Sequence, residues 1–230
     1  METRPRQGRR TARVVVIGAG SRGTGYAQLI QSQDRGVIAA VAEPSAYRRN
    51  QLGKSCIWGA RGADGPAEGE SFTGWKEFVE YETARRKQVA GQSADIDDGR
   101  IDAALVCVLD GMHVDAVRDL APLELHILCE KPLAPTLNGL FEIQRCLGDG
   151  GSGRDSRKVF AIGHVLRYSP VNRLLWKLVR EENVVGDVVS VEHTEPVGWW
   201  HFAHSYVRSV LSAFPCLLLP SCSTSPLYSC

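Results

Sequence analysis

A glycine-rich segment is the first part of this sequence whose residue spacing indicates ligand chemistry. A G-x-G-x-x-G pattern occupies residues 18–23, directly after the apolar run Val14 to Ile17. In this pattern the first glycine permits a tight turn, the second lets the backbone approach a diphosphate, and the third allows a helix to pack closely on a strand. Free N–H groups at the start of that helix bind phosphate oxygens. A glycine-rich turn without a ligand is the alternative, which the preceding strand disfavours. The predicted cofactor-binding residues are Gly18, Gly20, Ser21, Arg22 and Gly23.

An acidic residue stands at the spacing expected for ribose recognition. Glu43 comes twenty residues after Gly23, at the end of the second apolar run, where a carboxylate can accept hydrogen bonds from the adenosine ribose hydroxyls. Its charge would repel a 2′-phosphate, which favours NAD as the cofactor. Ser45, Arg48 and Arg49 follow and could pair with that phosphate, so NADP stays open.

A second group of candidate residues follows two later apolar runs. His113 comes shortly after the run Ala103 to Leu109, and Glu130 and Lys131 come directly after the run Leu125 to Cys129. Ligands of open parallel sheets bind at the carboxyl ends of the strands, so His113 and Lys131 would face the same crevice as the glycine loop. A lysine placed there could take the proton that is released when a hydride leaves a carbon bearing a hydroxyl group. An exposed lysine in an ion pair with Glu130 is the alternative.

The elements that must position these residues are strands alternating with helices. From Arg13 onward, short apolar runs alternate with amphipathic segments, which is typical of βαβ units in a parallel sheet. Helical spacing appears at Val114, Val117 and Ala121, and again in an apolar stripe from Val171 to Val179 that we expect to pack. Residues 59–71 and 148–156 are expected to be surface loops. The predicted strands are Val14 to Ile17, Val37 to Ala42, Ala103 to Leu109, Leu125 to Cys129 and Val159 to Ile162.

The same patterns divide the chain into four segments. We expect a basic arm over residues 1–12, a nucleotide-binding domain over 13–163, the start of a substrate domain over 164–208 and a separate tail over 209–230. The tail has no charged residue, although charged residues make up 23% of the chain. Its three prolines argue against a long helix or a membrane span. We interpret the tail as foreign to the fold, arising from intron read-through or a frameshift, with a hydrophobic anchor as the alternative.

The composition narrows the class of protein. A hydrophobic content of 43% is ordinary for a globular protein, and a net charge of +1 gives no long-range attraction to nucleic acid or anionic lipid. We find no apolar run of about 18 residues and no apolar stretch of a secretory signal at the start, so we expect no membrane association and a cytoplasmic location. The seven cysteines include no C-x-x-C pair, and His201 and His204 lack an evident third ligand, so no metal is expected.

On these motifs the chain resembles the Gfo/Idh/MocA oxidoreductases, the family of glucose-fructose oxidoreductase and inositol dehydrogenase. The resemblance runs from Arg13 to about Arg208 and is carried by VVVIGAGSRG, VAEP, CEKPLA and GHVLRYSP. It implies an α/β fold, with a Rossmann-type parallel sheet followed by the beginning of an incomplete α+β substrate domain. It also implies hydride transfer between NAD(P) and a CHOH group of a sugar or polyol, with Lys131 bonded to the reacting oxygen.

The resemblance assigns roles to further residues. His113 would form a wall beside the nicotinamide, and Glu130 and Arg167 would also lie at the cofactor. The aromatic and histidine-rich stretch 192–208 could line a sugar pocket, with Tyr168, His201 and His204 as candidate substrate residues.

The chain also departs from the family. Family members continue further and supply a downstream histidine and aspartate that act with the lysine, so we expect weak or no activity from this chain. Intact members often pair through the substrate-domain sheet, which implies a homo-oligomer. The alternative function is a non-catalytic NAD(P)-binding sensor, as in the galactose-pathway repressors of yeasts.

Overall fold

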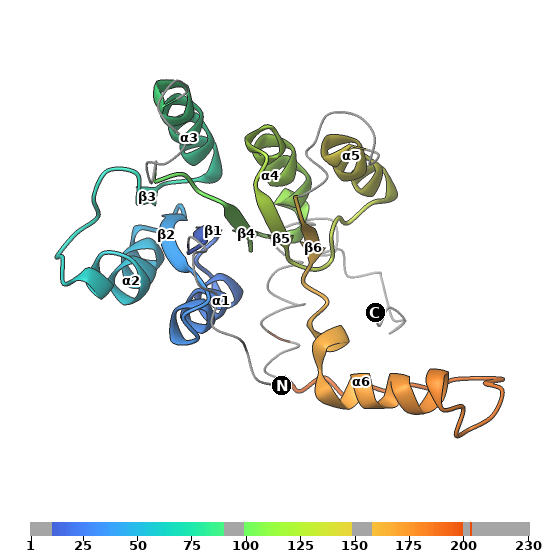
Figure 1. Ribbon diagram of the computed structural model, residues 1–230. Coiled ribbons are helices and arrows are strands. Elements are labelled where there is room, and N and C mark those ends of the chain that lie inside the picture. Colours follow the sequence, from blue (N-terminus) through green and yellow to red (C-terminus); the bar gives the residue numbers. More distant parts are fainter. Residues whose placement is uncertain (1–10, 90–98, 149–157, 200–202, 204–230) are drawn as a thin grey trace, which may run out of the picture. The chain divides into compact units, whose positions relative to one another are not determined.

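The computed structural model describes residues 11–89, 99–148, 158–199 and 203, and the chain divides into two compact units, 1–172 and 173–230. The first unit contains a six-stranded parallel sheet in the order β3-β2-β1-β4-β5-β6 (Figure 1). This is the strand order of a Rossmann fold, and the predicted α/β class with a parallel sheet is confirmed. The strands are β1 (Arg13–Ile17), β2 (Val37–Ala42), β3 (Ser71–Phe72), β4 (Ala103–Val106), β5 (His126–Cys129) and β6 (Phe160–Ile162).

Helices cover both faces of this sheet. α1 and α2 lie on one face, and α3, α4 and α5 lie on the other (Figure 1). Two N-terminal caps come from hydroxyl groups: Ser45 accepts from the N–H of Arg48 at the start of α2, and Thr136 accepts from the N–H of Gly139 at the start of α5. The helices are α1 (Ser21–Ser32), α2 (Ala46–Cys56), α3 (Trp75–Val89), α4 (His113–Leu120), α5 (Leu137–Leu147) and α6 (Pro170–Trp176).

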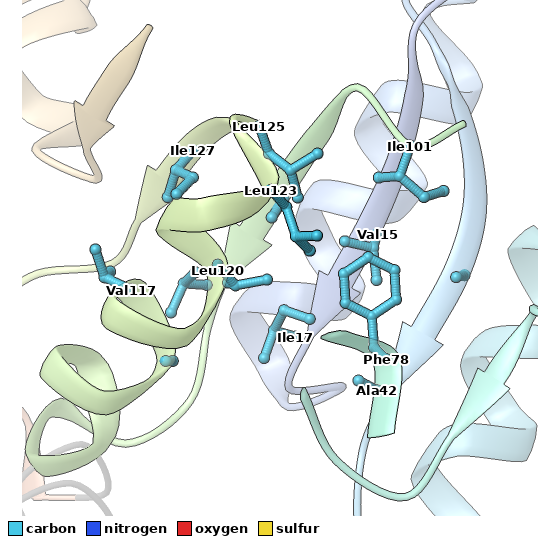
Figure 2. Close-up of a cluster of buried hydrophobic side chains, with 14 of the residues drawn as sticks. Val15, Ile17, Ala42, Phe78, Ile101, Val117, Leu120, Leu123, Leu125 and Ile127 are labelled. Carbon is cyan, nitrogen blue, oxygen red and sulfur yellow. The ribbon is translucent and has the colours of Figure 1, made fainter. Parts of the chain in front are cut away.

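The central strand β1 explains why the apolar runs of this sequence are continuous. Val15 and Ile17 point into a core cluster with α3, α4 and α5, where Figure 2 shows them beside Phe78 and Leu120. Val14 and the other alternate residues point into a second cluster with α1 and α2. Because both faces are buried, every residue from 14 to 17 must be apolar, and strict alternation is lost. The sequence signal for these strands is therefore the run itself.

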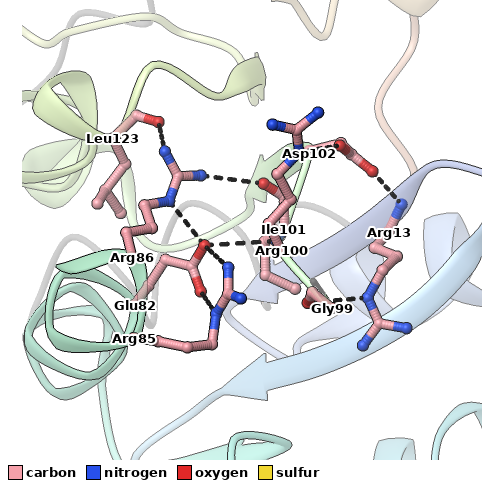
Figure 3. A network of polar contacts seen from close by, with 9 residues as sticks. All are labelled: Arg13, Glu82, Arg85, Arg86, Gly99, Arg100, Ile101, Asp102 and Leu123. Carbon is pink, nitrogen blue, oxygen red and sulfur yellow. Dashed lines mark hydrogen bonds and ion pairs between the residues drawn. The ribbon is translucent and has the colours of Figure 1, made fainter. Parts of the chain in front are cut away.

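A buried carboxylate fastens α3 to the start of β4 (Figure 3). Glu82 is 1% exposed and lies 2.8 Å from both Arg85 and Arg86. Arg86 also donates to the carbonyl oxygens of Leu123 and Ile101, at 2.6 and 3.1 Å. Burial raises the pKa of Glu82, but the two guanidinium groups outweigh it and the net pKa is lowered. This network fixes α3 to the segments that precede β4 and β5, at the amino ends of these strands.

Two sequence expectations about the sheet are corrected. The run from Ala103 continues to Leu109, but β4 ends at Val106 because the chain leaves the sheet after the bond from the N–H of Cys107 to Ile17. Leu109 is 69% exposed. The segment 59–71 was expected to be a loop throughout; it contains a 3-10 turn over Gly59–Arg61, and its last residue, Ser71, begins the short strand β3. A two-residue strand leaves no run of apolar residues to detect.

The apolar stripe from Val171 to Val179 is helical, but three of its side chains are exposed. α6 passes into a π-helical turn over Lys177–Glu181. Val171, Leu174 and Leu175 are 73%, 56% and 57% exposed, so the expectation of a packed face is wrong for these side chains. Within the described ranges, no helix combines the length and the apolar character that crossing a membrane requires.

The second unit is described mainly as irregular backbone after this turn. Lys177 and Glu182 form an ion pair of 3.1 Å, and the guanidinium of Arg180 lies 5.5 Å from the ring centroid of Trp176. The expected arm, the expected loop over 148–156 and the tail over 209–230 lie outside the described residues, apart from residues 11, 12 and 148. The expected domain boundaries stay predictions.

Candidate functional site

The glycine loop makes a tight turn between β1 and α1. Gly18 has a φ of +94°, and a Cβ there would lie 2.7 Å from the carbonyl oxygen of Cys107. A Cβ on Gly23 would lie 2.0 Å from the carbonyl oxygen of Gly18 and 3.0 Å from a methyl group of Val16. Both contacts are closer than real Cβ atoms allow, so only glycine fits either position. The loop sits where the strand order turns between β1 and β4, at the carboxyl ends of the strands.

The second glycine of the loop faces open space. Gly20 is the N-cap of α1 and receives no side-chain cap, and a Cβ on it would meet no atom within 4 Å. Ser21 and Arg22, in the first turn of α1, are exposed, and that turn contains no acidic residue. The amides at a helix start attract anions, and an acidic side chain there would compete with them. The backbone here therefore fits the diphosphate of a dinucleotide.

Glu43 joins the end of β2 to the glycine loop. Its carboxylate is 6% exposed and accepts from the N–H of Ala19 at 2.8 Å and from the N–H of Ser45 at 2.9 Å. A carboxylate can accept about four hydrogen bonds, so capacity for ribose hydroxyls is left. Arg49 donates to the carbonyl oxygen of Glu43 at 2.5 Å and to Ser71 at 3.2 Å. The side chain of Arg49 is thus held by Glu43, directly after β2, and by Ser71 of β3, whereas Arg48 is exposed.

The predicted Lys131 stands on a segment whose backbone is fixed. Glu130 is 7% exposed; one carboxylate oxygen accepts from the hydroxyl of Tyr26 at 2.5 Å and the other from the N–H of Lys131 at 3.3 Å. Gly163 makes room for this carboxylate, since a Cβ there would lie 2.6 Å from it. The Lys131–Pro132 peptide bond is cis. Lys131 itself is exposed, and the described part of the chain gives it no ion pair, so the alternative of a Glu130–Lys131 pair is not what the structure shows.

His113 holds the other side of the same segment. Its Nδ1 lies 2.8 Å from the carbonyl oxygen of Pro132 and its Nε2 lies 3.2 Å from that of Val108. The side chain is 1% exposed. A ring that is so deeply buried offers almost no surface to a cofactor, and its two contacts bridge the loops that follow β4 and β5. The role as a wall beside the nicotinamide stays a prediction.

Burial keeps the groups around Glu130 protonated. The pKa of Tyr26 is raised, first by burial and then by its hydrogen bond to Glu130 and the charge of that carboxylate. Burial, followed by the charge of Glu130, raises the pKa of Cys107 to about 12, and the same causes raise the pKa of Cys129 to about 12. At neutral pH Tyr26 is therefore the donor to Glu130, and these two thiols are not nucleophiles.

The contacts of the described residues do not bring Arg167 or Tyr168 to the glycine loop. Arg167 and Tyr168 lie in a 3-10 turn over Val165–Tyr168, both exposed, Tyr168 by 74%. His201 and His204 lie outside the described residues. In the described ranges no group of three His, Cys, Asp or Glu side chains could hold a metal ion.

Two residues of this site were missed by the sequence reasoning. Tyr26 lies one helical turn after Gly23, and Gly163 begins a motif that was noted only as a family signature. Neither has a sequence signal of its own, because each contacts Glu130 from a distant part of the chain.

Comparison with known proteins supports this assignment of fold. A family model described as "Oxidoreductase family, NAD-binding Rossmann fold" (GFO_IDH_MocA) matches residues 12–151. Inositol 2-dehydrogenase of Pseudarthrobacter chlorophenolicus is 24% identical over 198 residues, which cover 82% of this chain and 48% of that protein. The chain thus spans about half the length of this relative.

Solved structures share the fold at low identity. Scyllo-inositol dehydrogenase from Lactobacillus casei, with bound NAD(H) and scyllo-inositol, is 18% identical with a TM-score of 0.57, over 77% of this chain and 43% of that one. Myo-inositol 2-dehydrogenase from Lactobacillus plantarum is 16% identical with a TM-score of 0.58, over 78% and 44%. These values establish a shared architecture only.

Proposed function

Because this chain belongs to the Gfo/Idh/MocA oxidoreductase family, we propose that it binds NAD and serves hydride transfer to or from a CHOH group of a sugar or polyol. The observation that carries the proposal is the pairing of an open glycine loop with an exposed lysine, Lys131, that forms no ion pair with any described residue. α1 begins at the loop and contacts Glu130, the neighbour of Lys131, so both features belong to one arrangement. The similarity to inositol dehydrogenases points to cyclic polyols as the first substrates to test.

The residues of the loop would hold the cofactor, whose nicotinamide supplies the hydride acceptor or donor when bound. The amides near Gly20 and Ser21 would bind the diphosphate, and the free acceptor capacity of Glu43 would bind ribose hydroxyls. We infer a preference for NAD over NADP, because the buried negative charge of Glu43 opposes a 2′-phosphate and the side chain of Arg49 is already engaged.

Lys131 would handle the proton. Oxidation of a CHOH group releases a hydride from carbon and a proton from oxygen, and the proton needs an acceptor within hydrogen-bonding reach. The amine of Lys131 is exposed, while its backbone is fixed through Glu130 and Pro132. A fixed backbone with a free side-chain terminus suits a group that must meet a substrate hydroxyl in one orientation.

Cofactor binding and turnover should be measured separately on the full chain. We expect saturable binding of NADH in a fluorescence titration, and Gly20→Ala to weaken it by about 10- to 100-fold, since a methyl group would occupy the space of a hydrogen-bonded phosphate. Gly25→Ala is the matched control: Gly25 lies on the exposed side of α1, and its Cβ also meets no atom. Unchanged NADH affinity in Gly20→Ala contradicts the proposed cofactor site.

The catalytic half of the proposal depends on Lys131. With scyllo- or myo-inositol and NAD, Lys131→Ala should lower kcat by about 100-fold or more while the NADH dissociation constant stays within about threefold. Binding of NADH without turnover of sugars or polyols, both in this chain and in one extended with the substrate domain of a family member, would favour the nucleotide-sensing alternative.

A further inference from the structure

One hydrogen bond joins two segments that are 104 residues apart in sequence. Tyr26 donates its hydroxyl proton to Glu130, with 2.5 Å between the oxygens. Tyr26 stands in the second turn of α1, whose first turn carries the amides assigned above to the diphosphate. Glu130 directly precedes Lys131. The bond therefore connects the cofactor-binding helix to the lysine segment.

The carboxylate of Glu130 depends on this phenol. It is 7% exposed, and no basic side chain in the described ranges forms an ion pair with it. Its partners are the hydroxyl of Tyr26 and the more distant N–H of Lys131. Because Gly163, directly after β6, has no side chain, the carboxylate lies closely against its backbone and has little room to rotate away. Hydrogen bonds to a buried carboxylate are strong, and losing one of a small number of partners is energetically costly.

Lys131 is thus fixed at both neighbours and free at its amine. On one side Glu130 binds the N–H of Lys131 itself, and on the other side the ring of His113 contacts the carbonyl oxygen of Pro132. His113 starts α4 and reaches Val108 on the β4 side, whereas Tyr26 belongs to α1. Among the hydrogen bonds and ion pairs of the described residues, the Tyr26 contact is the one that links this segment directly to the helix that begins at the glycine loop. A shift of α1 would move Glu130, and with it the backbone from which Lys131 extends.

We propose that Tyr26 is a positioning residue, which ties the placement of Lys131 to occupancy of the dinucleotide site through Glu130. The proposal rests on the function proposed above. Anion binding at the first turn of α1 fixes the helix, the phenol transmits that position to the carboxylate, and the carboxylate sets the N–H of Lys131. Tyr26 touches neither substrate nor cofactor in this scheme.

The test is a spectroscopic signal of Lys131 that needs no turnover. Lysine amines of the full chain are labelled by reductive methylation with ¹³C, and the Lys131 signal is assigned from its loss in Lys131→Arg. Titration with NAD⁺ should shift this signal. In Tyr26→Phe we expect the NAD⁺-induced shift of the Lys131 signal to fall about tenfold, because one hydrogen bond to a carboxylate changes an equilibrium constant by about that factor. The NAD⁺ dissociation constant should change by less than about threefold.

Two further variants separate positioning from general damage. Tyr81→Phe removes a phenol hydroxyl from another half-buried tyrosine, which packs on Phe72 with ring centroids 5.4 Å apart, and it should keep the full shift. Glu130→Gln keeps the size of the side chain but leaves one acceptor oxygen for two donors, so it should also lose most of the shift. If Tyr26→Phe unfolds, Glu130→Gln carries the test.

Each outcome decides between the two proposals. A full Lys131 shift in both Tyr26→Phe and Glu130→Gln overturns the positioning role and leaves the cofactor site standing. A loss of NAD⁺ affinity that matches the loss of shift also overturns it, because Tyr26 would then act on binding. A chain without any affinity for NAD⁺ overturns the proposed function, and the positioning role with it.

Discussion

Replacing Gly23 by alanine should separate α1 from β1. The added Cβ would lie 2.0 Å from the carbonyl oxygen of Gly18, so about 1 Å of movement is needed to reach a tolerable contact near 3 Å. That oxygen cannot yield easily, because the N–H of Gly18 is bonded to Ala42 at 2.8 Å. Val16, the other neighbour, is fully buried. The helix must therefore move as a body.

The steric cost is isolated by comparison with Gly25→Ala. Both substitutions gain about 1 kcal/mol of helix propensity. Gly25 meets no atom within 4 Å, so its variant should be more stable than the unsubstituted chain by up to that amount. Overpacking against backbone costs about 3 kcal/mol or more, at the upper end of the usual range. Both variants gain the same helix propensity, so the difference between their free energies of unfolding equals the steric cost at Gly23.

Thermal unfolding and NADH titration measure the two consequences. For a chain of this size, about 3 kcal/mol corresponds to roughly 6–12 °C in Tm between the Gly23 and Gly25 variants. NADH affinity should fall at least tenfold in Gly23→Ala, because the amides of α1 move by about the distance that breaks a hydrogen bond. Equal melting temperatures in the two variants would refute this account of the loop.

Three further predictions concern stability and reactivity. Glu82→Ala should cost about 3 kcal/mol in urea unfolding, since it removes a buried carboxylate that two half-buried arginines contact. The folded pKa of Glu82 is lowered, so its contribution is full above the unfolded pKa of about 4.3 and is lost as pH falls through the folded pKa; the cost should shrink toward acid. Cys107 and Cys129, with a pKa of about 12, should resist iodoacetamide at pH 8 in peptide mapping, whereas unfolding in urea should expose both. Thr136→Ala should cost about 1 kcal/mol by loss of the α5 cap, measured by thermal unfolding.

The sheet could be predicted from sequence because burial on both faces makes its strands read as apolar runs. β2 was predicted at its observed bounds, Val37–Ala42, and β1 and β6 within one residue at one end. α2 and α3 gave no comparable signal. Their buried residues are few, such as Leu52 in α2 and Phe78 in α3, so the helices are mostly polar and their apolar periodicity is weak.

The candidate site was predictable only as far as local patterns reach. The glycine loop and Lys131 follow strand ends, and position relative to a strand is a local property. The partner of Glu130 was not predictable, because nothing near Tyr26 in sequence indicates a carboxylate about a hundred residues later. The burial of His113 was missed for the same reason: its carbonyl partner Pro132 is brought to it by the packing of neighbouring strand ends.

The two amides held by Glu43 constrain any redesign of cofactor choice. Exchanging this residue for a small neutral one, the obvious route toward acceptance of a 2′-phosphate, would strip acceptors from Ala19 and Ser45 at once. Each orphaned donor costs about 1–3 kcal/mol if no water replaces the lost oxygen. Cofactor selectivity and the structure of the glycine loop therefore depend on the same residue. A variant designed to accept NADP must replace Glu43 and also supply a new acceptor for both backbone N–H groups.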